Sequence, residues 1–138
     1  MSNVVVLLGL STLIFFSCKN KNEQSQEELS EQNIRVERIA GDSLATSFMI
    51  WVKDTVETHK HEWHSETIYV IEGEAAMYLN DTSLIIKPGD VVFIPKNTWH
   101  AVKVNSIRPL KVLSVQSPGF DGKDRVFKST KDAVDADY

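Results

Sequence analysis

Short β-like runs separated by turn residues fill most of the chain and limit it to an all-β fold. The expected strands cover residues 34–39, 44–53, 68–71, 75–79, 84–87, 91–94, 99–104 and 110–115. Asn80-Asp81 is typical of a two-residue hairpin turn, and Pro88-Gly89-Asp90 of a sharp turn. Because the runs show no 3.6-residue periodicity, the pattern predicts a β-sandwich or β-barrel.

The bulk composition agrees with one folded domain and excludes some partners. The chain has 138 residues, of which 42% are hydrophobic and 25% are charged, as in ordinary globular proteins. Its net charge is −4, and the Lys and Arg residues are dispersed along the sequence. We therefore expect no binding to nucleic acid and no electrostatic binding to an anionic membrane.

The N-terminal segment has the pattern of a cleaved export signal. Val4–Phe16 is apolar but shorter than the stretch of about 20 residues that spans a bilayer. It ends at Ser17-Cys18, and Cys18 is the single cysteine of the chain. This arrangement resembles a bacterial lipoprotein signal, although no Lys or Arg precedes it. An ordinary secretory signal and an uncleaved anchor are the alternatives.

The segments on either side of the expected barrel are polar. We predict a signal peptide over residues 1–17, then a lipidated Cys18 with a flexible tether over residues 18–33. The barrel is expected over residues 34–120, followed by a charged C-terminal arm over residues 121–138 that lies on the surface around Val126-Phe127. The protein is accordingly expected outside the cytoplasm, held at a membrane by the lipid alone.

Two histidines with a single residue between them lie at the end of a β-like region. Residues two apart in a strand point to the same side, so His59 and His61 can both face the barrel interior. Glu66 lies five residues after His61, which is the wrong parity for one continuous strand. Residues 62–65 are therefore expected to form a turn or bulge, after which Glu66 faces the interior.

A third histidine, His100, lies near the start of the strand expected over residues 99–104, on the same side as Val102 and Val104. Strand parity thus permits three imidazoles and one carboxylate to converge. The predicted metal ligands are His59, His61, Glu66 and His100. This set suits one divalent Mn, Fe, Ni, Zn or Cu ion and is too rich in nitrogen for Ca²⁺ or Mg²⁺.

At these residues the chain resembles the cupin superfamily. The first cupin motif is matched by His59, His61, Glu66 and Gly73, and the second by Gly89, Pro95 and His100. Three positions depart from these motifs, where Lys53 and Asn97 replace glycine and Val104 replaces asparagine. Asn97 can still adopt the left-handed backbone of the turn. The resemblance covers residues 43–117 and implies a single-domain jelly-roll barrel, the double-stranded β-helix.

The resemblance leaves two functions open. Because four protein ligands leave positions open on an octahedral ion, we expect an enzyme that acts on a small oxygen-bearing molecule, of the isomerase, lyase or dioxygenase type. The alternative is a lipoprotein that binds a sugar-like small molecule without catalysis. A general base beyond the ligands would favour the enzyme. A pocket lined only by apolar and aromatic groups would favour the binding protein.

Three residues beside the expected ligands are secondary candidates. His64 is either a loop histidine or a proton-transfer group near the metal. Trp63 and Trp99 flank ligands in the sequence, and they either line the mouth of a pocket or cover the barrel rim. Cupins commonly dimerise through edge strands, so a homodimer is a further expectation from the resemblance.

Overall fold

The computed structural model describes residues 32–120 and 122–128, and within these residues the fold is built from strands alone. The strands are β1 (Ile34–Gly41), β2 (Thr46–Val52), β3 (Thr55–Lys60), β4 (Ser65–Glu72), β5 (Ala75–Leu79), β6 (Thr82–Ile86), β7 (Val91–Ile94), β8 (His100–Val104), β9 (Leu110–Ser117) and β10 (Val126–Phe127). The all-β prediction is confirmed. Residues 55–60, which the sequence marks only as a β-like region before His61, form a strand of their own.

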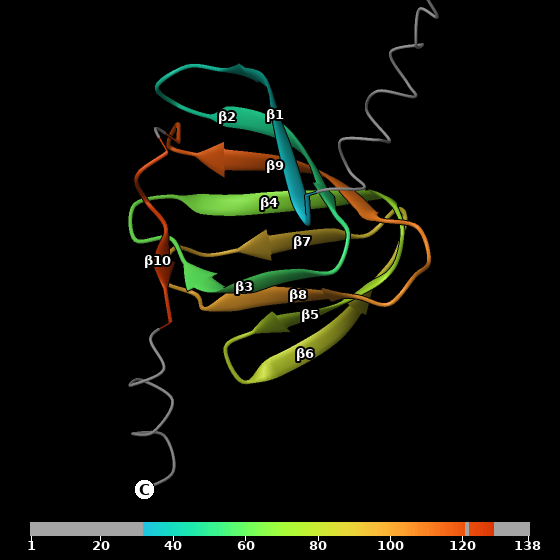
Figure 1. Ribbon diagram of the computed structural model, residues 1–138. Coiled ribbons are helices and arrows are strands. Elements are labelled where there is room, and N and C mark those ends of the chain that lie inside the picture. Colours follow the sequence, from blue (N-terminus) through green and yellow to red (C-terminus); the bar gives the residue numbers. More distant parts are fainter. Residues whose placement is uncertain (1–31, 121, 129–138) are drawn as a thin grey trace, which may run out of the picture.

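Two antiparallel sheets lie face to face (Figure 1). One has the strand order β1-β2-β9-β4-β7 and the other β10-β3-β8-β5-β6. Neighbours in each sheet are mostly distant in sequence, as in a jelly roll, where the chain crosses repeatedly between sheets. The topology agrees with the expected jelly-roll barrel. It also brings β3 and β8, which carry the histidines, to adjacent positions.

The core lies between the inner faces of the sheets. Alternate residues of each central strand are buried there, as the period of a strand requires. In β4 the inward residues are Glu66, Ile68 and Val70, and in β8 they are His100, Val102 and Val104. Aliphatic side chains fill most of the interior, each contributing about 1.5–3 kcal/mol when fully buried. The polar exceptions gather at one end of the barrel.

The turns follow the chemistry that the sequence predicts. Asn80 and Asn97 both have positive φ, 48° and 63°, and Gly89 has φ of 96°. Asn80 closes the hairpin between β5 and β6, and Gly89 lies in the turn before β7. Asn97 therefore does replace glycine in a left-handed position, at the loop that leads into His100.

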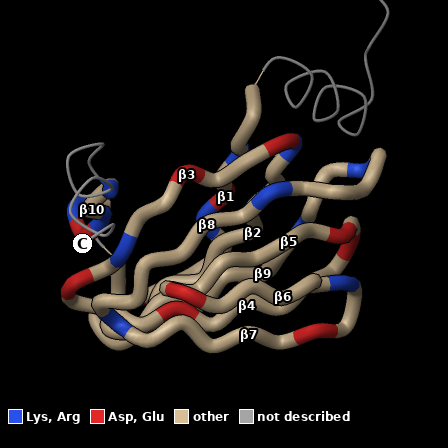
Figure 2. Tube along the Cα trace, turned by 90° about the horizontal axis from the view of Figure 1, so that it is seen from below, with Lys and Arg blue, Asp and Glu red and all other residues tan. Residues whose placement is uncertain are grey.

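The charged residues of the described chain do not form a single patch. Figure 2 shows Lys and Arg interspersed with Asp and Glu at many separate places around the barrel. Within the described residues, no helix has the length and apolar character needed to cross a bilayer. The predicted signal peptide, Cys18 and most of the tether lie outside the described residues, as does the chain after residue 128.

Candidate metal centre

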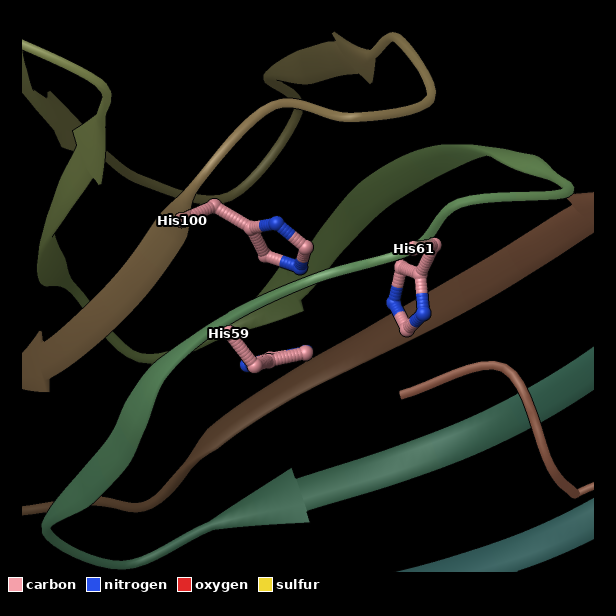
Figure 3. A group of neighbouring side chains, drawn as sticks. All are labelled: His59, His61 and His100. Carbon is pink, nitrogen blue, oxygen red and sulfur yellow. The ribbon is translucent and has the colours of Figure 1, made fainter. Parts of the chain in front are cut away.

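The end of β3 and the start of β8 bring three histidines together. His59 in β3 pairs across the sheet with His100 in β8, and His61 follows β3 by one residue. All three side chains are buried, with exposed fractions of 2–4%. One nitrogen of each lies within 4.8 Å of a nitrogen of the other two. Figure 3 shows the rings turned toward one another in the interior.

Hydrogen bonds to main-chain carbonyls determine which nitrogen of each histidine is available. Nδ1 of His59 donates to the carbonyl of Glu57 at 2.8 Å, and Nδ1 of His100 donates to that of Thr98 at 3.0 Å. Nδ1 of His61 donates to the carbonyl of Asp124 at 2.5 Å. A carbonyl can only accept, so each Nδ1 carries the hydrogen and each Nε2 keeps its lone pair.

The available nitrogens fit a metal ion. Nε2 of His61 and Nε2 of His100 are buried and make no hydrogen bond within the described structure. Buried polar atoms almost always have a partner, so two such atoms a few ångströms apart indicate an absent ligand. Hydrogen bonds from Nδ1 to carbonyls are also the usual support of histidines that bind metal through Nε2.

Glu66 supplies an oxygen to the same group. Its Oε2 lies 3.7 Å from Nε2 of His61 and 3.7 Å from Nε2 of His100. Its Oε1 accepts a short hydrogen bond from the Ser114 hydroxyl and another from Gln116 Nε2 at 3.3 Å. Ser114 and Gln116 face inward from β9, which pairs with β4 beside Glu66. One carboxylate oxygen is thus fixed by the sheet while the other faces the histidines.

The protonation states suit a metal site. Burial, together with the neighbouring His100, lowers the pKa of His59 to about 3. Burial also lowers the pKa of His100. Burial alone would raise the pKa of Glu66, but its contacts with His61 and Ser114 bring it down to about 2. Neutral His59 and His100 beside an ionised Glu66 are the forms that bind a divalent transition metal.

His64 lies beside the histidine group with a partner of its own. Its Nδ1 lies 2.8 Å from Oδ2 of Asp124, and its buried Nε2 makes no hydrogen bond within the described residues. Its ring stacks on His61, with centroids 4.1 Å apart and planes at 29°. Lone pairs lie in the ring plane, so stacked rings do not converge on one ion. His64, His61 and Asp124 therefore make a poor second metal site, although they are close together.

The two tryptophans lie in different hollows. Trp63 is 76% exposed and lines, with His64, Phe120 and Asp124, a cavity of about 270 Å³ beside the histidine group. Trp99 lines a hollow of about 340 Å³ beside β3, β5 and β8, together with Tyr78 and His100. The Lys60 ammonium lies 5.3 Å from the centre of the Trp99 ring.

Three residues of the centre were not found from the sequence. Ser114 and Gln116 carry a signal in hindsight, because they are polar at inward positions of a strand whose other inward residues are apolar. Asp124 carries none, because it lies in a charged segment with no strong pattern. Its exposed fraction is nevertheless only 8%.

The family of the chain follows from its sequence matches. Residues 47–116, half of the chain, match the model of the cupin domain. An uncharacterized protein of Aquifex aeolicus (strain VF5) is 31% identical over 101 residues, which are 73% of this chain and 83% of that protein. The chain therefore belongs to the cupin family, and its histidine-rich site lies where the cupin motifs fall.

Two further matches concern named enzymes. The quercetin 2,3-dioxygenase of Bacillus subtilis (strain 168) is 35% identical over 66 residues, covering 48% of this chain but only 19% of that enzyme. The structure of the Streptomyces nucleoside dehydratase Pac13 matches with a TM-score of 0.58 at 20% identity, covering 67% of this chain and 84% of that one. The second likeness concerns the fold alone.

Proposed function

We propose that this cupin is a metal-dependent enzyme that acts on a small oxygen-bearing molecule. His59, His61, Glu66 and His100 would hold one divalent ion of Mn, Fe, Ni, Zn or Cu. When bound, such an ion polarises an oxygen of a substrate and stabilises negative charge on it. Four ligands from the chain leave coordination positions for that oxygen, which distinguishes a working site from a structural one.

The observation that favours an enzyme is the pair formed by His64 and Asp124. Asp124 accepts the Nδ1 hydrogen of His64, so the buried lone pair of His64 is on Nε2. A carboxylate that orients an imidazole in this way is the usual support of a general base. His64 is thus the group beyond the ligands that a proton-transfer reaction needs, and it borders the cavity lined by Trp63 and Phe120.

The quercetin 2,3-dioxygenase match supports chemistry at an oxygen-bearing molecule and does not select a substrate. Dehydration and isomerisation require a proton to be moved, which His64 would do. We therefore favour lyase or isomerase chemistry over oxidation for this chain.

The alternative is a protein that binds a small, sugar-like molecule without converting it. The deep burial of the four ligands favours it, since their exposed fractions are only 2–7%. The cavity beside His64 is lined by residues other than these ligands. In a binding protein the ion would organise the barrel end, and His64 would serve only to pack on His61.

Two measurements on full-length protein loaded with Cu²⁺ or Fe²⁺ distinguish these functions. Azide should change the absorption spectrum of the loaded protein if coordination positions are open. In a screen of sugar acids, nucleosides and flavonols, His64→Ala should lower turnover by about 10²–10⁴-fold while metal content stays at the wild-type level. Tyr69→Ala, at an exposed position of β4, serves as the control. Binding without turnover, together with no effect of His64→Ala, would support the alternative of a binding protein. A spectrum that azide does not change would contradict open coordination positions on the ion.

We also propose that the domain is attached to a membrane outside the cytoplasm through a lipid on Cys18. The apolar segment ending at Ser17 and the polar residues that follow it support this attachment.

Homodimer formation likewise stays a prediction, which sedimentation velocity on the soluble domain would check.

A further inference from the structure

The segment after β9 folds back over the end of the barrel that holds the histidines. Its short strand β10 pairs with β3, where Val126 lies opposite Lys60 and Phe127 opposite His59. The ring of Phe127 lies 5.9 Å from that of His59, and the ring of Phe120 lies 5.0 Å from that of His64. Figure 1 shows β10 at one end of the two sheets, beside the end of β3. This segment lies beyond the matched cupin domain, which ends at residue 116.

Among the described residues of this returning segment Asp124 is the buried one, and its carboxylate binds the loop between β3 and β4. Oδ1 accepts the main-chain N–H of Glu62 at 2.8 Å. Oδ2 accepts the main-chain N–H groups of Trp63 at 2.7 Å and His64 at 3.1 Å, as well as Nδ1 of His64. One carboxylate thus satisfies three consecutive main-chain donors and an imidazole, which defines the path of the loop between His61 and Glu66.

The main-chain carbonyl of Asp124 has a separate role. It is the acceptor for Nδ1 of His61, at a separation of 63 residues. His59 and His100 instead donate to carbonyls only two residues before them, Glu57 and Thr98. Strand geometry alone therefore orients two of the three histidines. The orientation of the third depends on a distant segment that must dock first.

We propose that Asp124 is a positioning residue for the metal centre, through which the C-terminal segment orients both His61 and His64. The carboxylate docks the segment, and docking brings the carbonyl to His61. The assignment rests on the proposed metal site. It adds that the matched cupin domain, residues 47–116, does not complete that site by itself in this chain. Partners of this kind beyond the direct ligands typically change metal affinity by about 10–100-fold.

The hydrogen-bond pattern predicts a graded series of variants. Asp124→Ala removes all four acceptor contacts of the side chain, so the carbonyl is no longer held at His61. Asp124→Asn keeps one carbonyl oxygen, which can occupy the Oδ2 position and retain three contacts, while its NH₂ faces the N–H of Glu62. The asparagine should therefore restore most of what alanine loses. Asp81→Ala, at an exposed acid in the β5–β6 turn, matches the loss of charge and removes none of these four contacts.

The first experiment measures Zn²⁺ affinity of the full-length variants by competition with a chromophoric chelator. We expect Asp124→Ala to bind about 10–100-fold more weakly than wild type, with Asp124→Asn between them and Asp81→Ala unchanged. His64→Ala should keep near wild-type affinity, because the carbonyl of Asp124 still reaches His61. Circular dichroism confirms that the β-sheet content is retained. Wild-type affinity in Asp124→Ala would overturn the proposal.

A second experiment needs no metal and separates this proposal from the function of the site. In ¹⁵N NMR spectra of metal-free protein, His61 and His64 should each show the single tautomer with hydrogen on Nδ1. In Asp124→Ala both should shift toward a mixture of tautomers, while His59 and His100 keep theirs. If wild type bound no Zn²⁺, the proposed function would fail while these spectra still decided the role of Asp124. Unchanged His61 and His64 tautomers in Asp124→Ala would refute the positioning role of Asp124.

Discussion

Replacing Ser114 by alanine tests how the carboxylate of Glu66 is held under the histidines. Ser114 is fully buried and donates a short hydrogen bond to Oε1 of Glu66, which Gln116 also contacts at 3.3 Å. A hydrogen bond to a buried charged group contributes about 1.5–3 kcal/mol. In a domain of this size 1 kcal/mol changes the melting temperature by about 4–8 °C. Ser114→Ala should therefore lower the melting temperature of the metal-free protein by roughly 10 °C.

The assay is thermal unfolding of the metal-free protein at neutral pH, with two comparisons. Ser117→Ala, in the same strand, removes an exposed hydroxyl that donates to the carbonyl of Leu44, and it should cost less than about 1 kcal/mol. In a Glu66→Gln background the Ser114→Ala change should cost less than in wild type, because the acceptor is then neutral. Equal unfolding midpoints for Ser114→Ala and Ser117→Ala would refute the reasoning.

Three further predictions concern other parts of the account. The pKa of His59 falls from 6.5 to about 3 on folding and that of Glu66 from 4.5 to about 2, so the unfolded state binds more protons between these values. Metal-free protein should thus lose stability as the pH falls below 6.5, and a constant urea midpoint down to pH 4 would contradict this. Asn97→Gly should keep the wild-type melting temperature, whereas Asn97→Ala should cost about 1–2 kcal/mol because φ is 63°, and equal melting temperatures would argue against strain. Cys18→Ala should leave the protein unlipidated by mass spectrometry, and a free thiol in membrane-purified wild type would exclude the anchor.

Strand alternation explains why much of the centre is visible in the sequence. A strand has a period of two, so the spacing of His59 and His61 places both rings in the interior. The break in parity before Glu66 requires a loop, and the structure has that loop between β3 and β4. His100 follows from the same parity argument in β8. These predictions depend on local geometry and on few distant contacts.

The remaining features depend on contacts between distant parts of the chain. Asp124 lies in a charged segment, and its burial follows only from the return of that segment across the barrel end. Its bond to His61 joins residues 63 positions apart, which no local pattern reports. The position of Trp99 in a hollow shared with Tyr78 also follows from packing. Local periodicity could not have determined these contacts.

The metal content of protein purified without added metal tests the central claim most directly. Elemental analysis of the wild type should find about one transition-metal ion per chain, as four converging donors in one cluster hold a single ion. The His61→Ala, His100→Ala double variant should lose that ion and keep its β-sheet content, whereas the Asp81→Ala control should retain it. Wild-type metal content in the double variant, or a wild type that takes up no transition metal even when it is supplied, would contradict the account.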